Sequence, residues 1–372
     1  MVRITRNTTQ NHASVAHRYT HIDTMKAIGI VLVVLGHAPG LNDFVKNVIY
    51  SFHMPLFFFV SGLLLTGPKV SLPFKHYFLQ AWHALGVPYL FFFLISYLYW
   101  LPTHGLSSRA DQYSDMAWWA PLSGVLIGNG EALFVNVVLW FFTCLLVTAL
   151  IFHLARKYFS AGLLLLCFNL GALLFAFARE PSWPRLPWGL DNAIVALGFY
   201  SAGHYLHSCQ PGILARISSK TAILIAAISI AGLIYGAFLN GEVDLNTLIF
   251  GHHPTLYFIN AYLGVLVLFC LAIQLSGHAI TRWLSQNSII IFPLHLLMFS
   301  VFTGIGVVVF GLPHTFKSSA IGWTISFTVL ALLLSYPSAW ILKRCAPAVF
   351  LKRSKPPAPD TKLESSQPVL KT

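Results

Sequence analysis

The chain has 372 residues, of which 56% are hydrophobic and only 9% are charged, against roughly 25% charged residues in an ordinary soluble domain. So few charged side chains exclude a water-soluble globular surface. The formal net charge is +12 at pH 7, but the Lys and Arg residues are spread through short loops and the C-terminal segment, so a nucleic-acid-binding face is not expected.

Apolar segments long enough to cross about 30 Å of hydrocarbon as helices recur along the chain. The ten that we predict run over residues 24–38, 48–65, 81–101, 132–152, 161–178, 192–206, 222–239, 255–275, 289–311 and 320–342. The sequence therefore predicts an all-α, polytopic membrane helix bundle of about ten transmembrane helices. We expect residues 1–21 to be a cytoplasmic segment, residues 22–342 the transmembrane domain, and residues 343–372 a disordered cytoplasmic tail.

The positions of the basic residues predict the orientation, because Lys and Arg near the ends of spans are retained on the cytoplasmic side. If the N-terminus is inside, 18 of the 23 Lys and Arg residues lie on the inner side. The other five, Lys46, Arg109, Arg179, Arg185 and Lys317, lie outside. Both termini are therefore expected in the cytoplasm, with the inner-side charges attracted to anionic membrane lipids.

The first predicted span contains ionisable residues, which are costly inside a membrane and are therefore functional candidates. Asp23 and Lys26 lie one helical turn apart, and His37 lies eleven residues after Lys26. Eleven steps of about 100° return to nearly the same helix face, about 16 Å further along the axis. Lys26 and His37 are thus predicted to face one cavity. The alternative is that Lys26 snorkels to the inner surface and pairs with Asp23, while His37 merely caps the span.

The later spans add further polar and aromatic candidates. The run SFHMPLFFFVSG places His53 and Ser61 in the second span, and two adjacent spans with polar groups indicate a lined cavity. The remaining candidates are Glu131 and Trp140 at the fourth span, and Asn287, Ser288 and His295 at the ninth. Each has a plainer interpretation: His295 as a packed core residue, Trp140 as an interface aromatic and Glu131 as a solvated loop residue. No metal site is expected.

The string HIDTMKAIGIVLVVLGH resembles the opening helix of acyltransferase family 3, whose hallmark is a basic residue, ten intervening residues and a histidine. In the family an aspartate precedes the basic residue by three positions, and Asp23, Lys26 and His37 occupy these places. The blocks FHMPLFFFVSGLLL, LWFFTCLL and NSIIIFPLH match in order, so the resemblance extends to about Leu342. The family usually has arginine in place of Lys26; lysine keeps the charge without the bidentate fork and fits the branch that resembles fucose 4-O-acetylases and exopolysaccharide acetyltransferases.

This resemblance implies a membrane O-acyltransferase of the bacterial inner membrane. Its expected reaction moves an acetyl group from acetyl-CoA to a hydroxyl of a cell-surface or exopolysaccharide sugar, or of its lipid-linked precursor. Acetyl-CoA is the expected donor, and no tightly bound cofactor is expected. The expected partners are the saccharide acceptor, membrane lipids and polysaccharide biosynthesis machinery, with no nucleic acid.

The chemistry assigns roles to the candidate residues. A sugar hydroxyl must lose its proton as it attacks the thioester, so His37 is the predicted general base. His53, Asn287 and Ser288 are the candidate donors to the oxyanion. Lys26, oriented by Asp23, is predicted to bind the phosphates of the donor, and Ser61 and Trp140 are also assigned to donor binding. Glu131, Asn287, Ser288 and His295 are assigned to the acceptor.

Other functions remain open from the sequence. One alternative is a transporter or flippase of lipid-linked saccharides, with its ionisable residues lining a path. A haem or quinone protein with His37 and His53 as ligands is a further alternative. Within the acyltransferase reading, succinyl could replace acetyl, and transfer could proceed through an acetyl-histidine intermediate.

Overall fold

The computed structural model describes residues 3–106, 116–209 and 217–350. These residues form helices joined by short loops, with one isolated β-bridge and no strand. Eight of the described helical segments are long and apolar enough to cross a membrane. The predicted all-α, polytopic membrane bundle is therefore confirmed.

Each of the ten predicted segments overlaps at least one helix, although residues 48–65 are divided between two helices by a turn at Ser51 and Phe52. The long helices are α1 (Arg3–Gly36), α5 (Val87–Thr103), α8 (Trp140–Arg156), α9 (Ala161–Ala178), α10 (Leu190–Cys209), α12 (Ser219–Asn240), α13 (Pro254–Leu275), α14 (Ala279–Gly304) and α15 (Ile321–Cys345). The shorter helices are α2 (Asp43–Tyr50), α3 (His53–Leu63), α4 (Phe74–Ala81), α7 (Ala120–Ile127) and α16 (Pro347–Phe350). Single 3₁₀ or π turns are η1 (Gly67–Lys69), η2 (Trp82–Gly86), η3 (His104–Leu106), η4 (Val137–Leu139), η5 (Pro187–Gly189), η6 (Ile305–Val309) and η7 (His314–Ser318).

Two predicted spans, those in α1 and α10, are not among the eight apolar segments. Helix α10 carries the buried polar side chains Asp191, Asn192 and His204. Such residues lower the mean hydropathy of a helix, although the helix still packs inside the bundle. In this protein α10 packs against α3, α8 and α9, and α1 packs against α13, α14 and α15.

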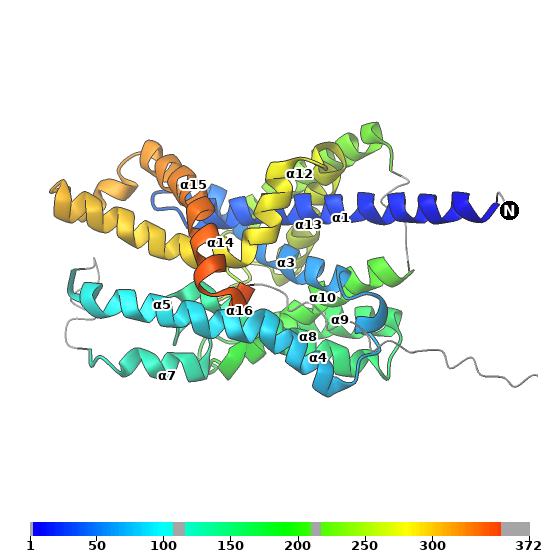
Figure 1. Ribbon diagram of the computed structural model, residues 1–372, viewed down its shortest axis with the longest axis horizontal. Helices are drawn as coiled ribbons and strands as arrows, with labels where there is room; N and C mark the ends of the chain where they lie inside the picture. Colours follow the sequence, from blue (N-terminus) through cyan, green and yellow to red (C-terminus); the bar gives the residue numbers. More distant parts are fainter. Residues whose placement is uncertain (1–2, 107–115, 210–216, 351–372) are drawn as a thin grey trace, which may run out of the picture.

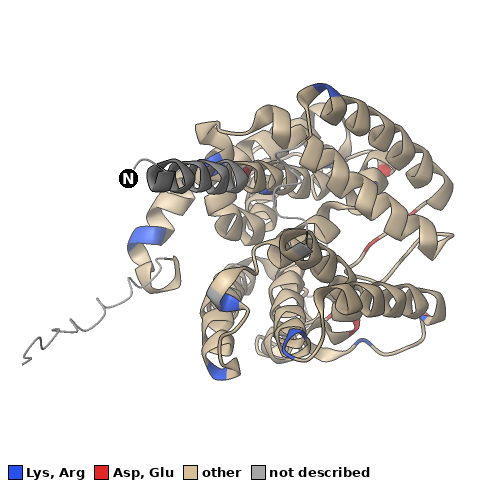
Figure 2. Ribbon diagram, turned by 90° about the vertical axis from the view of Figure 1, so that its right-hand side faces the viewer, with Lys and Arg blue, Asp and Glu red and all other residues tan. Residues whose placement is uncertain are grey.

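Figure 1 shows α1 and α14 running the same way, from right to left, while α15 runs steeply across them. Viewed from the end at which α1 begins, only short stretches of ribbon carry charged residues (Figure 2). Large apolar side chains face outward instead: Leu166 of α9 is 65% exposed, Phe238 of α12 72% and Leu333 of α15 63%. This inversion of a soluble surface is what a lipid environment requires.

Glycines allow α3 to pack closely against α10. A Cβ atom at Gly62 of α3 would overlap the carbonyl oxygen of Tyr200, and one at Gly203 of α10 would overlap the carbonyl oxygen of Phe59. Small residues that let backbones approach are typical of helix contacts within membranes. This crossing fixes α3, which carries His53, against the rest of the bundle.

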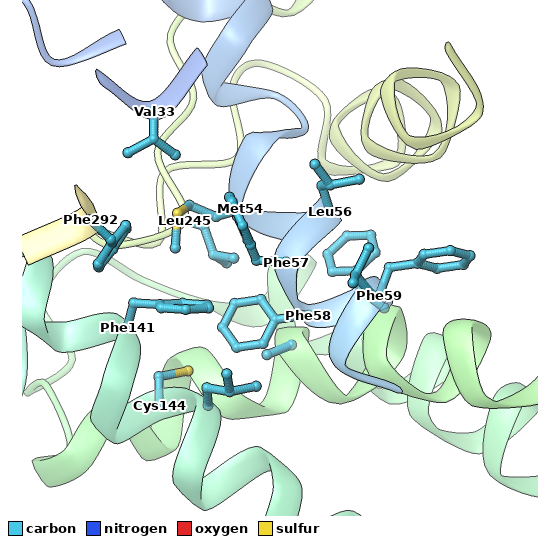
Figure 3. Close-up of a cluster of buried hydrophobic side chains, with 14 of the residues drawn as sticks. Val33, Met54, Leu56, Phe57, Phe58, Phe59, Phe141, Cys144, Leu245 and Phe292 are labelled. Carbon is cyan, nitrogen blue, oxygen red and sulfur yellow. The ribbon is translucent and has the colours of Figure 1, made fainter. Parts of the chain in front are cut away.

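The core contains a side chain from a loop as well as from helices. Figure 3 shows Leu245, from the connection between α12 and α13, among Val33 of α1, Met54 and Phe57 of α3, and Phe292 of α14. Leu245 is 1% exposed. The loop therefore folds into the bundle at the end where α1 finishes.

Both predicted boundaries of the transmembrane domain fall within helices. Helix α1 begins at Arg3, so the predicted N-terminal segment is a helical extension of the first span. At the other end α15 continues to Cys345 and α16 follows, with the Phe350 ring 5.4 Å from that of Phe91 and 5.8 Å from that of Phe92. Residues 343–350 thus belong to the bundle, and the predicted disorder of residues 351–372 lies outside the described residues.

Candidate active site

Three histidines from three helical segments meet at the end of α1. The ring centroid of His37, directly after α1, lies 5.1 Å from that of His295 in α14 and 6.4 Å from that of His53 in α3. His53 and His295 are buried, at 3% and 0% exposure, whereas His37 is half-buried. The structure therefore brings together the predicted base and two other predicted site residues, with His37 as the only partly exposed member of the three.

Backbone carbonyls fix the tautomers of two of these histidines. Nδ1 of His37 lies 3.1 Å from the carbonyl oxygen of Val33, and Nδ1 of His53 lies 2.9 Å from that of Ile49. A carbonyl oxygen only accepts a hydrogen bond, so each Nδ1 carries the proton. In the neutral imidazole Nε2 then has a free lone pair, which is the form that a general base requires.

His295 differs from both. Neither of its ring nitrogens has a hydrogen-bond partner among the described residues, although the ring is fully buried. A buried polar group without a partner costs free energy, so its ring nitrogens are available to a polar group that enters the cluster. Nearby, the side-chain amide of Asn136 donates to the carbonyl oxygen of Pro293 at 2.9 Å, which holds this part of α14 in place.

Ser285 of α14 joins the two charged residues of the motif. Nζ of Lys26 donates to its carbonyl oxygen at 3.1 Å, and its hydroxyl donates to Oδ1 of Asp23 at 2.6 Å. Lys26 and Asp23 are half-buried, so the cation stands at the edge of the bundle with its position set by α14. Ser285 thus helps to orient the Lys26 ammonium, a role that the sequence analysis gave to Asp23 alone.

Helices α1 and α14 stay in register over the length of the motif. Near one end, Lys26 forms a hydrogen bond with Ser285. Near the other end, His37 contacts the ring of His295. The two pairs are separated by eleven residues along the chain of α1 and by ten along α14. Two parallel helices that advance about 1.5 Å per residue keep such pairs opposite each other. The prediction that Lys26 and His37 share one side of α1 agrees with these contacts, because both face α14.

Asn287 and Ser288 lie at the Lys26 end of α14. The Ser288 hydroxyl donates to the carbonyl oxygen of Ser285 at 2.9 Å, and Oδ1 of Asn287 accepts from Nζ of Lys343 at 2.6 Å. Ser288 precedes His295 by seven residues, or about 10 Å along the helix. This spacing separates both residues from the histidines, so they are poorly placed as oxyanion donors there.

The other predicted site residues lie apart from the histidine cluster. The Ser61 hydroxyl is satisfied within α3 by the carbonyl oxygen of Phe57, at 2.7 Å. Trp140 is buried at the start of α8, with its ring 6.4 Å from that of Phe141. The side chain of Glu131 is 69% exposed and lies 3.9 Å from Arg185. None of the three makes a contact with a histidine of the cluster in the described residues.

Sequence reasoning missed Tyr50, Ser285 and Lys343. The ring centroid of Tyr50 lies 4.8 Å from that of His53 and 5.6 Å from that of His37. Tyr50 precedes His53 by only three residues in the sequence, which was a usable signal. The sequence held no such signal for Ser285, because serine is common in membrane helices. Lys343 entered the sequence analysis only as one of the basic residues that predict the orientation of the protein in the membrane.

The comparison with protein families adds independent evidence. A family model described as an acyltransferase domain matches residues 19–340. The chain belongs to acyltransferase family 3. It is thus a multi-pass membrane O-acyltransferase, and the matched region of this acyltransferase contains Asp23, Lys26 and all three clustered histidines. No curated protein and no solved structure matches the chain.

Proposed function

We propose that this acyltransferase moves an acetyl group from acetyl-CoA to a hydroxyl of a sugar in a cell-surface polysaccharide or its lipid-linked precursor. The observation that carries the proposal is His37, whose Nδ1 proton is held by the Val33 carbonyl and whose Nε2 is left to accept a proton. The reaction would take place in the bacterial inner membrane, with the acceptor arriving at the end of α1 that carries His37.

The reaction balances around Nε2 of His37. This atom takes the proton of the sugar hydroxyl while the sugar oxygen forms an ester bond to the acetyl carbon. The C–S bond of the thioester then breaks, and the imidazolium returns its proton to the departing CoA sulfur. The histidine ends as it began, so no additional reactant is needed.

The oxyanion of the tetrahedral intermediate needs an N–H donor. The Nδ1 proton of His53 is already bonded to the Ile49 carbonyl, so the neutral ring can only accept at Nε2. His295 has two ring nitrogens without partners among the described residues and lies 5.1 Å from His37 between ring centroids. We therefore assign the oxyanion donor to His295, and His53 to shaping the pocket beside His37.

The donor's phosphates would bind at the other end of α1. Lys26 stands there with its ammonium held by Ser285, and Lys343 of α15 lies near the same stretch of α14 through Asn287. Two ammonium groups suit a phosphate-bearing ligand. The distance of about 16 Å along α1 between Lys26 and His37 is one that the extended pantetheine arm of CoA largely covers.

The test is transfer of labelled acetyl from acetyl-CoA to the saccharide fraction of producing cells, using membranes that contain equal amounts of each variant. We expect incorporation by the wild type and a loss of at least about 100-fold in His37→Ala. His314→Ala is the matched control, because His314 is exposed in η7, and it should retain full activity. A fully active His37→Ala protein would contradict the assignment of the base, and no transfer by any variant would contradict the reaction.

A further inference from the structure

Two segments far apart in the sequence supply polar groups beside the histidine cluster. One is α2, which ends with Tyr50, and the other is residues 241–253, here called the α12–α13 loop. Helix α2 packs against α12, immediately before this loop. The proposed reaction assigns no role to either segment.

The α12–α13 loop is held rigidly. The side-chain amide of Asn192 donates to the carbonyl oxygens of Leu245 and Asn246, and that of Asn240 donates to the carbonyl oxygen of Phe250. A β-bridge joins Asp244 to Ile249 across the turn. Buried polar contacts of this number fix one conformation, so the side chains of the loop have defined positions.

The insertion of Leu245 into the core sets the position of Asp244. Leu245 packs in the cluster that includes Val33, whose carbonyl holds His37, and Met54, which follows His53 (Figure 3). Asp244 precedes Leu245 directly and is half-buried. Its Oδ1 accepts from the backbone N–H of Asn246 at 2.8 Å, and the carboxylate also interacts with the side chain of Thr247.

Asp244 faces Lys46 and Tyr50 of α2. Burial raises the pKa of Asp244, while the backbone N–H of Asn246, the charge of Lys46, the side chain of Thr247 and the charge of Arg185 lower it. Arg185 is already paired with Asp191, whereas the ion pairs of the described residues include none with Lys46. The Asp244 carboxylate also interacts electrostatically with the hydroxyl of Tyr50.

Tyr50 connects this charged pair to the catalytic histidines. Nζ of Lys46 lies 5.1 Å from the centroid of the Tyr50 ring, and the same ring contacts His37 and His53. The hydroxyl of Tyr50 has no hydrogen-bond partner in the described part of the chain. Tyr50 therefore contacts the proposed base, Lys46 lies over the Tyr50 ring, and the Asp244 carboxylate interacts electrostatically with both.

We propose that Lys46, Tyr50 and Asp244 form the subsite that holds the acceptor sugar, which we infer to be a neutral ring with hydroxyls beside the one that is acylated. This inference rests on the proposed function. Each sugar hydroxyl both donates and accepts hydrogen bonds; Asp244 accepts, Lys46 donates and Tyr50 does either. A carboxylate beside an ammonium suits neighbouring hydroxyls and disfavours an acidic sugar, because Asp244 would repel a second carboxylate.

The experiment measures the apparent KM for the acceptor and for acetyl-CoA separately, with protein in lipid nanodiscs. The acceptor is the glycolipid and polysaccharide fraction of producing cells, stripped of O-acetyl groups with mild base. Asp244→Asn and Lys46→Met should each raise the acceptor KM by about 10-fold or more, and Tyr50→Phe by a smaller factor, with the KM for acetyl-CoA unchanged. Glu242→Gln is the matched control, because Glu242 is exposed in the same loop.

The outcomes separate the two proposals. Transfer by the wild type with an unchanged acceptor KM in Asp244→Asn and Lys46→Met overturns the subsite and leaves the reaction intact. No transfer by the wild type overturns the proposed function, and the subsite falls with it. A lower melting temperature of Asp244→Asn with an unchanged acceptor KM shows that the carboxylate only supports the loop, and it also overturns the subsite.

Discussion

The rings of His37 and His295 lie 5.1 Å apart, centroid to centroid, with their planes at 78°. His37 uses its Nδ1 proton on a backbone carbonyl, while His295 has no hydrogen-bond partner for either nitrogen among the described residues. The two imidazoles therefore differ in their hydrogen-bonding capacity. Nε2 of His37 can accept a proton, whereas His295 can donate an N–H.

This difference predicts separate effects of substitution at His295. His295→Phe should lower kcat by about 10²- to 10³-fold, as removal of an oxyanion donor does, with little change in either KM. His295→Gln keeps an N–H group and should retain more activity than His295→Phe. Steady-state kinetics of both variants in nanodiscs check the order, and equal activities would remove His295 from the role of donor.

Lys26 is expected to act on donor binding through its charge. Lys26→Met should raise the KM for acetyl-CoA by about 10- to 100-fold, because a charge-assisted hydrogen bond contributes about 1.5–3 kcal/mol. Lys26→Arg should retain activity, since the positive charge persists. Lys75→Met is the control, because Lys75 is an exposed lysine of α4.

The contrary outcome for Lys26 is equally measurable. If Lys26→Met lowers the melting temperature of the protein and leaves the KM for acetyl-CoA unchanged, then the bond to the Ser285 carbonyl is its main contribution. In that case Lys26 ties α1 to α14 and does not bind the donor.

The contact of α3 with α10 predicts sensitivity to a single methyl group. Gly62→Ala and Gly203→Ala should each destabilise the protein by about 1–3 kcal/mol, because the added carbon overlaps a backbone carbonyl of the opposite helix. Gly171→Ala in α9 has open space around the new atom and should be neutral. Thermal unfolding in detergent, followed by size-exclusion chromatography, tests the comparison.

The orientation predicted from the basic residues is open to a direct test. A green fluorescent protein fused after Thr372 should fluoresce, and alkaline phosphatase fused there should be inactive, because both reporters reveal a cytoplasmic C-terminus. A phosphatase fused after Phe310, between α14 and α15, should be active. The reverse pattern would invert the assignment of the Lys26 end to the cytoplasm.

Part of the site was predictable because it lies within one helix. Helix periodicity alone places Lys26 and His37 on one side of α1 about 16 Å apart, and both do face α14. The proximity of His37 to His53 and His295 was not predictable, because contacts between helices depend on packing. The glycines of α3 and α10 and the register of α14 against α1 set those contacts.

By itself, the sequence determined the membrane environment, the all-α class and the position of nearly every helix, because scarcity of charge and apolar length are properties of local segments. It also determined the family, through a motif with fixed spacing. Only the tertiary structure decided that Ser285 joins Asp23 to Lys26 and that Asp244 lies near Lys46 and Tyr50 of α2. The physical reason is that these contacts join residues more than 190 positions apart, and their partners are chosen by the shape of the folded bundle.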